Sequence, residues 1–101
     1  MNNFRTFTLA VEFYQLASAL RLKSHLKEQL SRASSSIALN LAEGAGRFSN
    51  KDRNRFYQIA FGSLRECQAI LELSLINVPE LKKKADCLAA HIYRLINRNK
   101  G

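Results

Sequence analysis

The amino-acid sequence predicts an all-α protein built as an antiparallel, up-down-up-down four-helix bundle. The 101 residues include one proline and four glycines, too few turn-forming residues for a fold rich in strands. Apolar residues recur at spacings of three and four along successive long segments. The connections between these segments are short, and short connections place consecutive helices antiparallel. A chain of this length forms one domain, expected over residues 1–101.

The first helix is expected over Phe4–Arg21. It carries two apolar stripes, so it should be buried against more than one neighbour, either inside a bundle or across a subunit contact. The second helix is expected to begin within Lys23–Leu26 and to end at Glu43. Gly44 then lies just after the helix end, where the left-handed conformation favours glycine.

The third helix is expected to begin near Asn50, because Ser49 and Asp52 have the spacing of a capping box. Its apolar pattern extends to Ile76. Gly62 in its interior costs about 1 kcal/mol relative to alanine, which predicts close approach of a neighbouring helix.

Pro79 begins the fourth helix, with Asn77 as a possible cap. A core face recurs along this helix at spacings of three and four. Its members are Leu81, Ala85, Leu88, Ile92 and Leu95.

Several classes of protein are disfavoured. The N-terminal segment has no uninterrupted apolar run before a small-residue cleavage site, and no stretch is long enough to span a membrane, so we expect a cytoplasmic protein. Cys67 and Cys87 are expected to be reduced and buried. Neither Glu43 nor Glu66 has a histidine three residues later, as di-iron bundles require. We therefore expect no metal, no cofactor and no enzymatic activity.

The chain is strongly basic, with 16 Lys and Arg against 8 Asp and Glu and a formal net charge of +8. A dense cluster of cations lies in the second connection and the first turn of the third helix, where Phe48 or Tyr57 is available for base stacking. It is either a solvated helix end or a phosphate-binding patch. The candidate phosphate ligands are Arg47, Lys51, Arg53 and Arg55, with Lys82, Lys83 and Lys84 as secondary candidates.

The segment 36–49, SIALNLAEGAGRFS, followed by Phe56, by 60–64 and by Glu66, carries a resemblance to a known family. It resembles the bacterial four-helix-bundle family first noticed as open reading frames within intervening sequences of large-subunit ribosomal RNA genes. The resemblance implies a homopentameric barrel around a central channel, without known catalysis. The accessory variability protein of diversity-generating retroelements shares the fold, and is a basic pentamer that binds nucleic acid and a reverse transcriptase.

The resemblance also suggests a structural polar network between the second and third helices. Glu43 or Glu66 is expected to pair with Arg47, and Asn40 to bond across to Ser63, which would fix the register of the two helices.

The sequence thus leads to two hypotheses. The first is a non-enzymatic, oligomeric protein that binds structured RNA or DNA through phosphate contacts, as an accessory to a reverse transcriptase or other RNA-processing machinery. The alternative is a structural or adaptor module for a protein partner, in which the basic charge serves solubility or partner choice.

Overall fold

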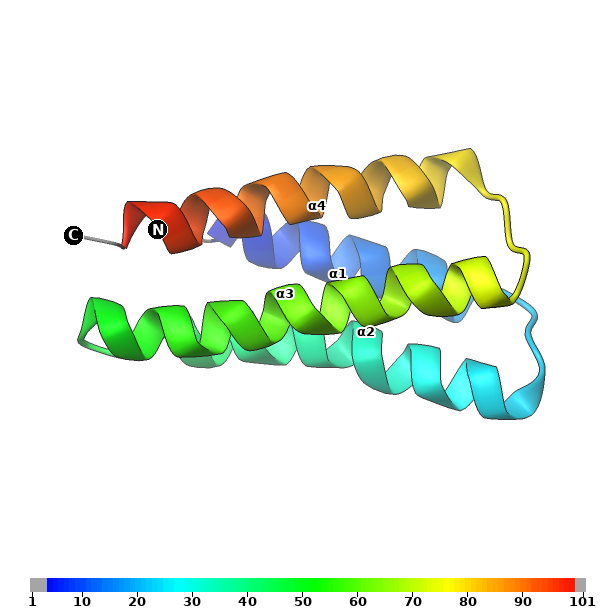
Figure 1. Cartoon of the computed structure of the whole chain (residues 1–101), viewed down its shortest axis with the longest axis horizontal. Helices are drawn as coiled ribbons and strands as arrows, with labels where there is room; N and C mark the ends of the chain where they lie inside the picture. Colours follow the sequence, from blue (N-terminus) through cyan, green and yellow to red (C-terminus); the bar gives the residue numbers. More distant parts are fainter. Residues whose placement is uncertain (1–3, 100–101) are drawn as a thin grey trace.

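The computed structural model describes residues 4–99 and confirms an all-α fold without strands over that range (Figure 1). The helices alternate in direction and lie side by side, as their short connections require. They are α1 (Phe4–Ser18), α2 (Ser24–Ala45), α3 (Asn50–Leu73) and α4 (Pro79–Arg98).

Each helix contacts two others, and the most extensive contact is between α2 and α3. α1 packs against both α2 and α4, and its backbone does not approach that of α3 closely. These two neighbours account for the two apolar stripes of α1, since Phe13 is fully buried while Leu16 and Leu20 pack at the edge of the same core. Both apolar stripes therefore pack against helices of the same chain.

The helix ends are fixed by a few local contacts. Ser49 Oγ accepts a hydrogen bond from the backbone N–H of Asp52 at 3.1 Å, which confirms the predicted start of α3. Pro79 opens α4 as predicted, but the residue before it is Val78 with no side-chain cap, so the assignment of Asn77 as cap is wrong. At the end of α1, Lys27 Nζ donates to backbone carbonyls of the last turn and the following connection.

Gly44 lies inside α2, which continues to Ala45, so its predicted position after the helix end is wrong. No glycine in the described residues has a positive φ. A Cβ at Gly44 would lie 2.7 Å from Tyr57 Cε1 and 3.1 Å from the backbone oxygen of Arg53. Glycine is needed here because α3 packs directly on the α2 backbone.

Gly62 was predicted to allow close approach of another helix, and this prediction is wrong within the described chain. No heavy atom outside its own turn would lie within 4 Å of a Cβ at this position, and Gly62 is exposed on α3. The helix-propensity cost of Gly62 therefore has no compensating contact in a single chain.

The end of α3 departs from the expected helix to Ile76. The chain leaves the helix after Leu73, and Leu75 adopts a left-handed conformation with φ 56°. The backbone N–H of Ile76 bonds to Leu71 O and that of Leu75 to Glu72 O, both at 3.1 Å. This is a Schellman motif with leucine where glycine is usual.

Replacement of Leu75 by glycine is expected to stabilise the protein by about 1 kcal/mol, because it removes the steric cost of a left-handed side chain. Leu75 is 90% exposed, so the substitution sacrifices almost no burial. Chemical denaturation of the two proteins at equal concentration measures the difference. A Leu75→Ala variant keeps the left-handed strain and should show no such gain. Equal gains in stability for both variants would contradict the attribution of the gain to relief of that strain.

The two cysteines differ in environment, and both are free thiols. Cys67 is fully buried, and burial raises its pKa to about 12, with the nearby Glu66 carboxylate adding to the rise. Cys87 is exposed, so the prediction that both cysteines are buried is wrong for this one. It lies on the outer side of α4, one residue before the buried Leu88.

We expect a thiol reagent at pH 8 to modify Cys87 rapidly and Cys67 only after unfolding, because the reactive species is the thiolate. Intact-mass measurement should show one adduct per native chain and two in denaturant. The raised pKa also predicts that the contribution of Cys67 to stability is complete below pH 9 and is lost as the pH rises toward 12. Rapid double labelling of the native protein would refute the burial of Cys67.

Candidate nucleic-acid interface

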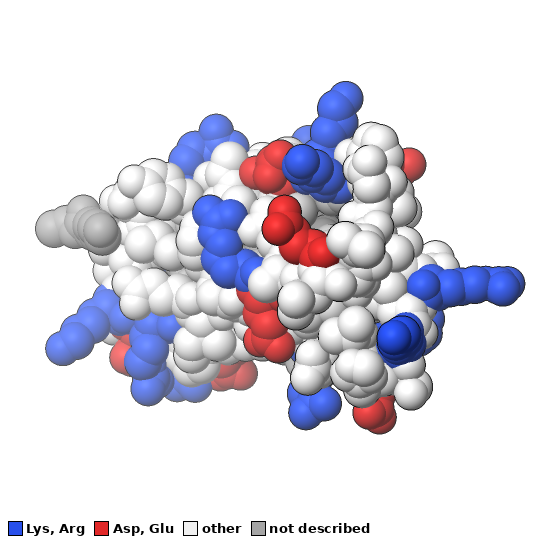
Figure 2. Space-filling model, turned by 45° about the vertical axis from the view of Figure 1, so that its right-hand side comes forward, with Lys and Arg blue, Asp and Glu red and all other residues white. Residues whose placement is uncertain are grey.

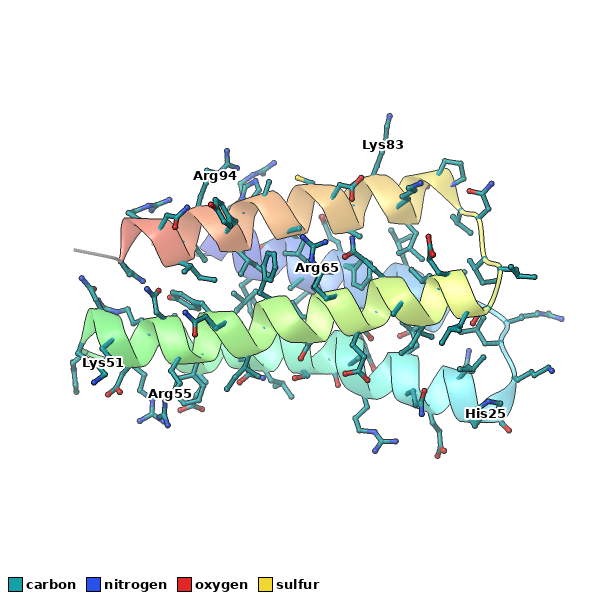
Figure 3. All side chains as sticks on the ribbon, viewed as in Figure 1. His25, Lys51, Arg55, Arg65, Lys83 and Arg94 are labelled. Atoms are coloured by element: carbon teal, nitrogen blue, oxygen red, sulfur yellow. The ribbon has the colours of Figure 1, made fainter. Side chains whose placement is uncertain are left out.

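The first basic cluster lies at the end of the molecule where α2 joins α3. The connection occupies residues 46–49, and Lys51 and Arg55 project outward from the beginning of α3 (Figure 3). The start of α1 and the end of α4 lie at this same end (Figure 1). The short connection and the capped start of α3 thus hold these cations on one surface.

Arg47 is held by two partners from different helices. Its Nη2 donates to Glu43 Oε2 at 2.8 Å, an ion pair four residues apart with both side chains partly exposed. Its guanidinium also lies 4.7 Å from the ring centre of Phe56, and the guanidinium of Arg55 lies 4.9 Å from the same ring. Such cation–π contacts orient guanidinium groups without neutralising their charge.

The remaining cations of this cluster are less constrained by acidic groups. Arg53 Nη1 donates to Asn50 Oδ1 at 2.8 Å, a neutral partner that leaves its charge uncompensated. Lys51 is exposed and has no ion pair within residues 4–99. Asp52, in the first turn of α3, complements the helix dipole that the cations oppose. Three charges therefore stay available for an anionic ligand: Lys51, Arg53 and Arg55.

The second basic cluster lies on the first turns of α4, toward the opposite end of the bundle (Figure 3). Figure 2 shows Lys and Arg side chains at both ends of the molecule. Lys82 and Lys83 are exposed, whereas Lys84 Nζ forms an ion pair with Glu12 Oε1 at 2.9 Å. Lys84 thus joins α4 to α1. The structure does not bring the two clusters together.

The hydrogen bonds between α2 and α3 differ from those of the predicted polar network. Asn40 does not bond to Ser63; its Nδ2 donates to Ser36 O at 2.9 Å and to Ser36 Oγ at 3.0 Å. Ser36 Oγ and Ser63 Oγ then share a hydrogen bond of 3.0 Å between α2 and α3. Glu66 is exposed and takes no part, so Glu43 is the partner of Arg47. Ser36 completes the link because it lies one turn before Asn40.

A surface hollow of about 660 Å³ lies beside the α2–α3 connection. Arg47, Phe48, Glu43 and Asp52 lie in its wall. Phe48 is 97% exposed, whereas Tyr57 is buried beneath Gly44. Of the two aromatic residues considered for base stacking, only Phe48 is accessible.

A second hollow of about 590 Å³ adjoins the first. It includes Lys51 and Arg55, and it shares Asp52 with the first hollow. Sequence reasoning missed Asp52 as a site residue because its spacing from Ser49 already explained it as a capping-box position. The two hollows meet at Asp52, in the first turn of α3.

Neither a metal-binding cluster nor a membrane-spanning helix is found in the part of the chain that the structure describes. In residues 4–99, no group of three histidine, cysteine, aspartate or glutamate side chains is placed to hold a metal ion. None of the four helices has a long enough apolar stretch to cross a membrane.

Comparison with known proteins identifies the family. No curated protein matches the chain. A family model described as 23S rRNA-intervening sequence protein matches residues 4–97, which include all four helices except the last residue of α4. The match covers both basic clusters and the Ser36–Ser63 link. This chain therefore belongs to the 23S rRNA-intervening sequence protein family.

Proposed function

We propose that this protein is a non-enzymatic nucleic-acid-binding protein that acts on RNA as a self-associating assembly. The observation that carries the proposal is the group of three cations at the start of α3, Lys51, Arg53 and Arg55, which form no ion pair within residues 4–99. Lys51 and Arg55 line one of the two adjoining hollows. A surface with several uncompensated cations attracts the phosphate backbone regardless of sequence. The net charge of +8 strengthens this field, and the family description points to ribosomal RNA.

The test is fluorescence anisotropy of the nuclease-treated protein with a labelled RNA hairpin and a labelled DNA duplex. Three phosphate contacts per site should weaken binding on the order of 40-fold between 50 and 200 mM salt. An assembly that engages several chains should show a steeper dependence. Absence of binding at 50 mM salt, or binding that salt does not weaken, would refute the proposal.

Self-association as a homopentamer is part of this proposal. It is supported by large apolar side chains that the single chain leaves exposed on α2 and α3, namely Leu39 and Ile59. Light scattering after size-exclusion chromatography is expected to give about five times the 11.5 kDa chain mass. A monomeric mass would reject the pentamer.

A second candidate function is docking to a protein partner such as a reverse transcriptase or an RNA-processing enzyme. It is favoured by Leu73 and Leu75, which are 74% and 90% exposed at the end opposite the basic α2–α3 connection. One end would then contact nucleic acid and the other a protein. A Leu73→Ser/Leu75→Ser variant should lose such a partner and keep its affinity for RNA.

A further inference from the structure

The exposure of Phe48 is unexplained by the fold. It lies in the short connection between α2 and α3, next to Arg47, and 97% of it is accessible. The ring contributes almost nothing to the core. An exposed aromatic ring flanked by cations is the usual arrangement for stacking an unpaired base, because every base has an apolar face and a phosphate nearby.

The hollow beside Phe48 offers hydrogen-bond acceptors whose arrangement suits one base. Glu43 Oε2 is occupied by Arg47, but the Asp52 carboxylate accepts no hydrogen bond from any side chain in residues 4–99. A carboxylate offers two adjacent acceptors. Guanine presents two adjacent donors, N1–H and the N2 amino group, on its Watson–Crick edge, whereas adenine and cytosine each present a single amino group there.

The neighbouring hollow supplies the charge that such a ligand needs. Lys51 and Arg55 line it together with Asp52, so a base beside Asp52 would have its phosphates over these two cations. A base-paired guanine has its Watson–Crick edge occupied and both faces stacked. The arrangement therefore suits a single strand or a loop, not a continuous duplex.

From this geometry we propose that the hollow binds an unpaired guanine in a nucleic-acid strand. Phe48 stacks on the base, Asp52 accepts its N1–H and N2–H donors, and Lys51 with Arg55 contact the adjoining phosphates. This inference rests on the proposed function and specifies its ligand: a guanine within a single-stranded segment or a loop.

The chain has no tryptophan, so a Phe48→Trp variant carries one fluorophore at the proposed stacking position. The probes are RNAs of five nucleotides, all uridine except for the central position, which is guanosine, adenosine or uridine. Stacking should quench the fluorescence saturably, at the lowest concentration for the guanosine probe. The control is Leu73→Trp, an exposed position at the opposite end of α3, whose fluorescence should not change.

Two further variants test the roles of single residues. Phe48→Ala should weaken binding of the guanosine probe by about 5- to 100-fold and leave affinity for a blunt RNA duplex unchanged. Asp52→Asn should reduce the preference for guanosine over adenosine by about tenfold or more, the discrimination expected of a bidentate pair. Circular dichroism and light scattering of each variant verify that the helices and the assembly are intact.

The outcomes separate this inference from the proposed function. Salt-sensitive binding of duplex and single strand that is indifferent to Phe48→Ala would overturn the stacking site and leave phosphate binding standing. Equal affinity for all three five-nucleotide RNAs would overturn the role of Asp52. A Phe48→Ala variant with unchanged RNA affinity and a smaller assembly mass would reassign the ring to a contact between copies. Absence of binding to any nucleic acid would remove both proposals.

Discussion

Substitution of Gly44 by alanine is expected to destabilise the protein by about 2 kcal/mol, and substitution of Gly62 by alanine to stabilise it by about 1 kcal/mol. Both glycines lie inside helices, so intrinsic helix propensity favours alanine at both positions. The opposite signs arise from packing alone. A Cβ at Gly44 meets Tyr57 Cε1 at 2.7 Å, whereas one at Gly62 meets nothing within 4 Å.

The cost at Gly44 cannot be relieved by a small side-chain movement. Tyr57 is only 2% exposed, so its ring has no free space to enter, and the backbone oxygen of Arg53 closes the other side at 3.1 Å. The methyl group must therefore push α3 away from α2, along the most extensive helix contact in the bundle. Overpacking of this kind costs about 1–3 kcal/mol beyond any gain in helix propensity.

Urea denaturation of both variants at the same protein concentration is the measurement, because self-association makes stability depend on concentration. A Gly44→Ala/Tyr57→Leu double variant should recover part of the loss, since leucine is smaller than the tyrosine ring. Unchanged stability of Gly44→Ala would show that the helix pair is looser than the structure indicates. A less stable Gly62→Ala protein would show that another surface packs on that turn.

The second large effect is expected on nucleic-acid affinity. A Lys51→Glu/Arg55→Glu variant should bind a labelled RNA hairpin at least about 100-fold more weakly, and the slope of affinity against salt should become shallower by about one per lost contact. The matched control is Lys82→Glu/Lys83→Glu. It changes the formal net charge by the same amount, but at the opposite end of the bundle.

The comparison distinguishes a local interface from a general charge effect. If the α2–α3 end is the interface, the first pair loses binding and the control pair is weakened only modestly through the long-range field. Equal losses would indicate that net charge alone drives binding. A larger loss for the α4 pair would place the interface at the other end.

The sequence was sufficient for features that depend on neighbours along the chain. Ser49 caps α3 because its hydroxyl needs only the N–H of Asp52, and Pro79 begins α4 because its ring suits a first turn. The apolar spacing likewise predicted the buried face of α4, including Leu88 and Ile92. All of these are local properties.

Features that depend on residues far apart were misread. The role of Gly44 depends on Tyr57, which reaches it only after α3 folds back on α2. Two local features were also misread. Leu75 adopts the left-handed conformation although it is not a glycine, and Cys87 was expected to be buried from its residue type although it lies outside the predicted core face of α4. Phosphate-binding candidates could be listed from charge, but the partner of Lys84 is Glu12 from α1, a pairing that spacing does not reveal.

The pattern of helix contacts has a consequence for the way the protein folds. Apart from the contact between α1 and α4, every helix pairs with the next one along the chain, which gives a low contact order and favours rapid folding. The first basic cluster lies wholly on one hairpin, α2 and α3 with their connection. Closure of the bundle needs only one contact between helices far apart along the chain, that of α1 with α4.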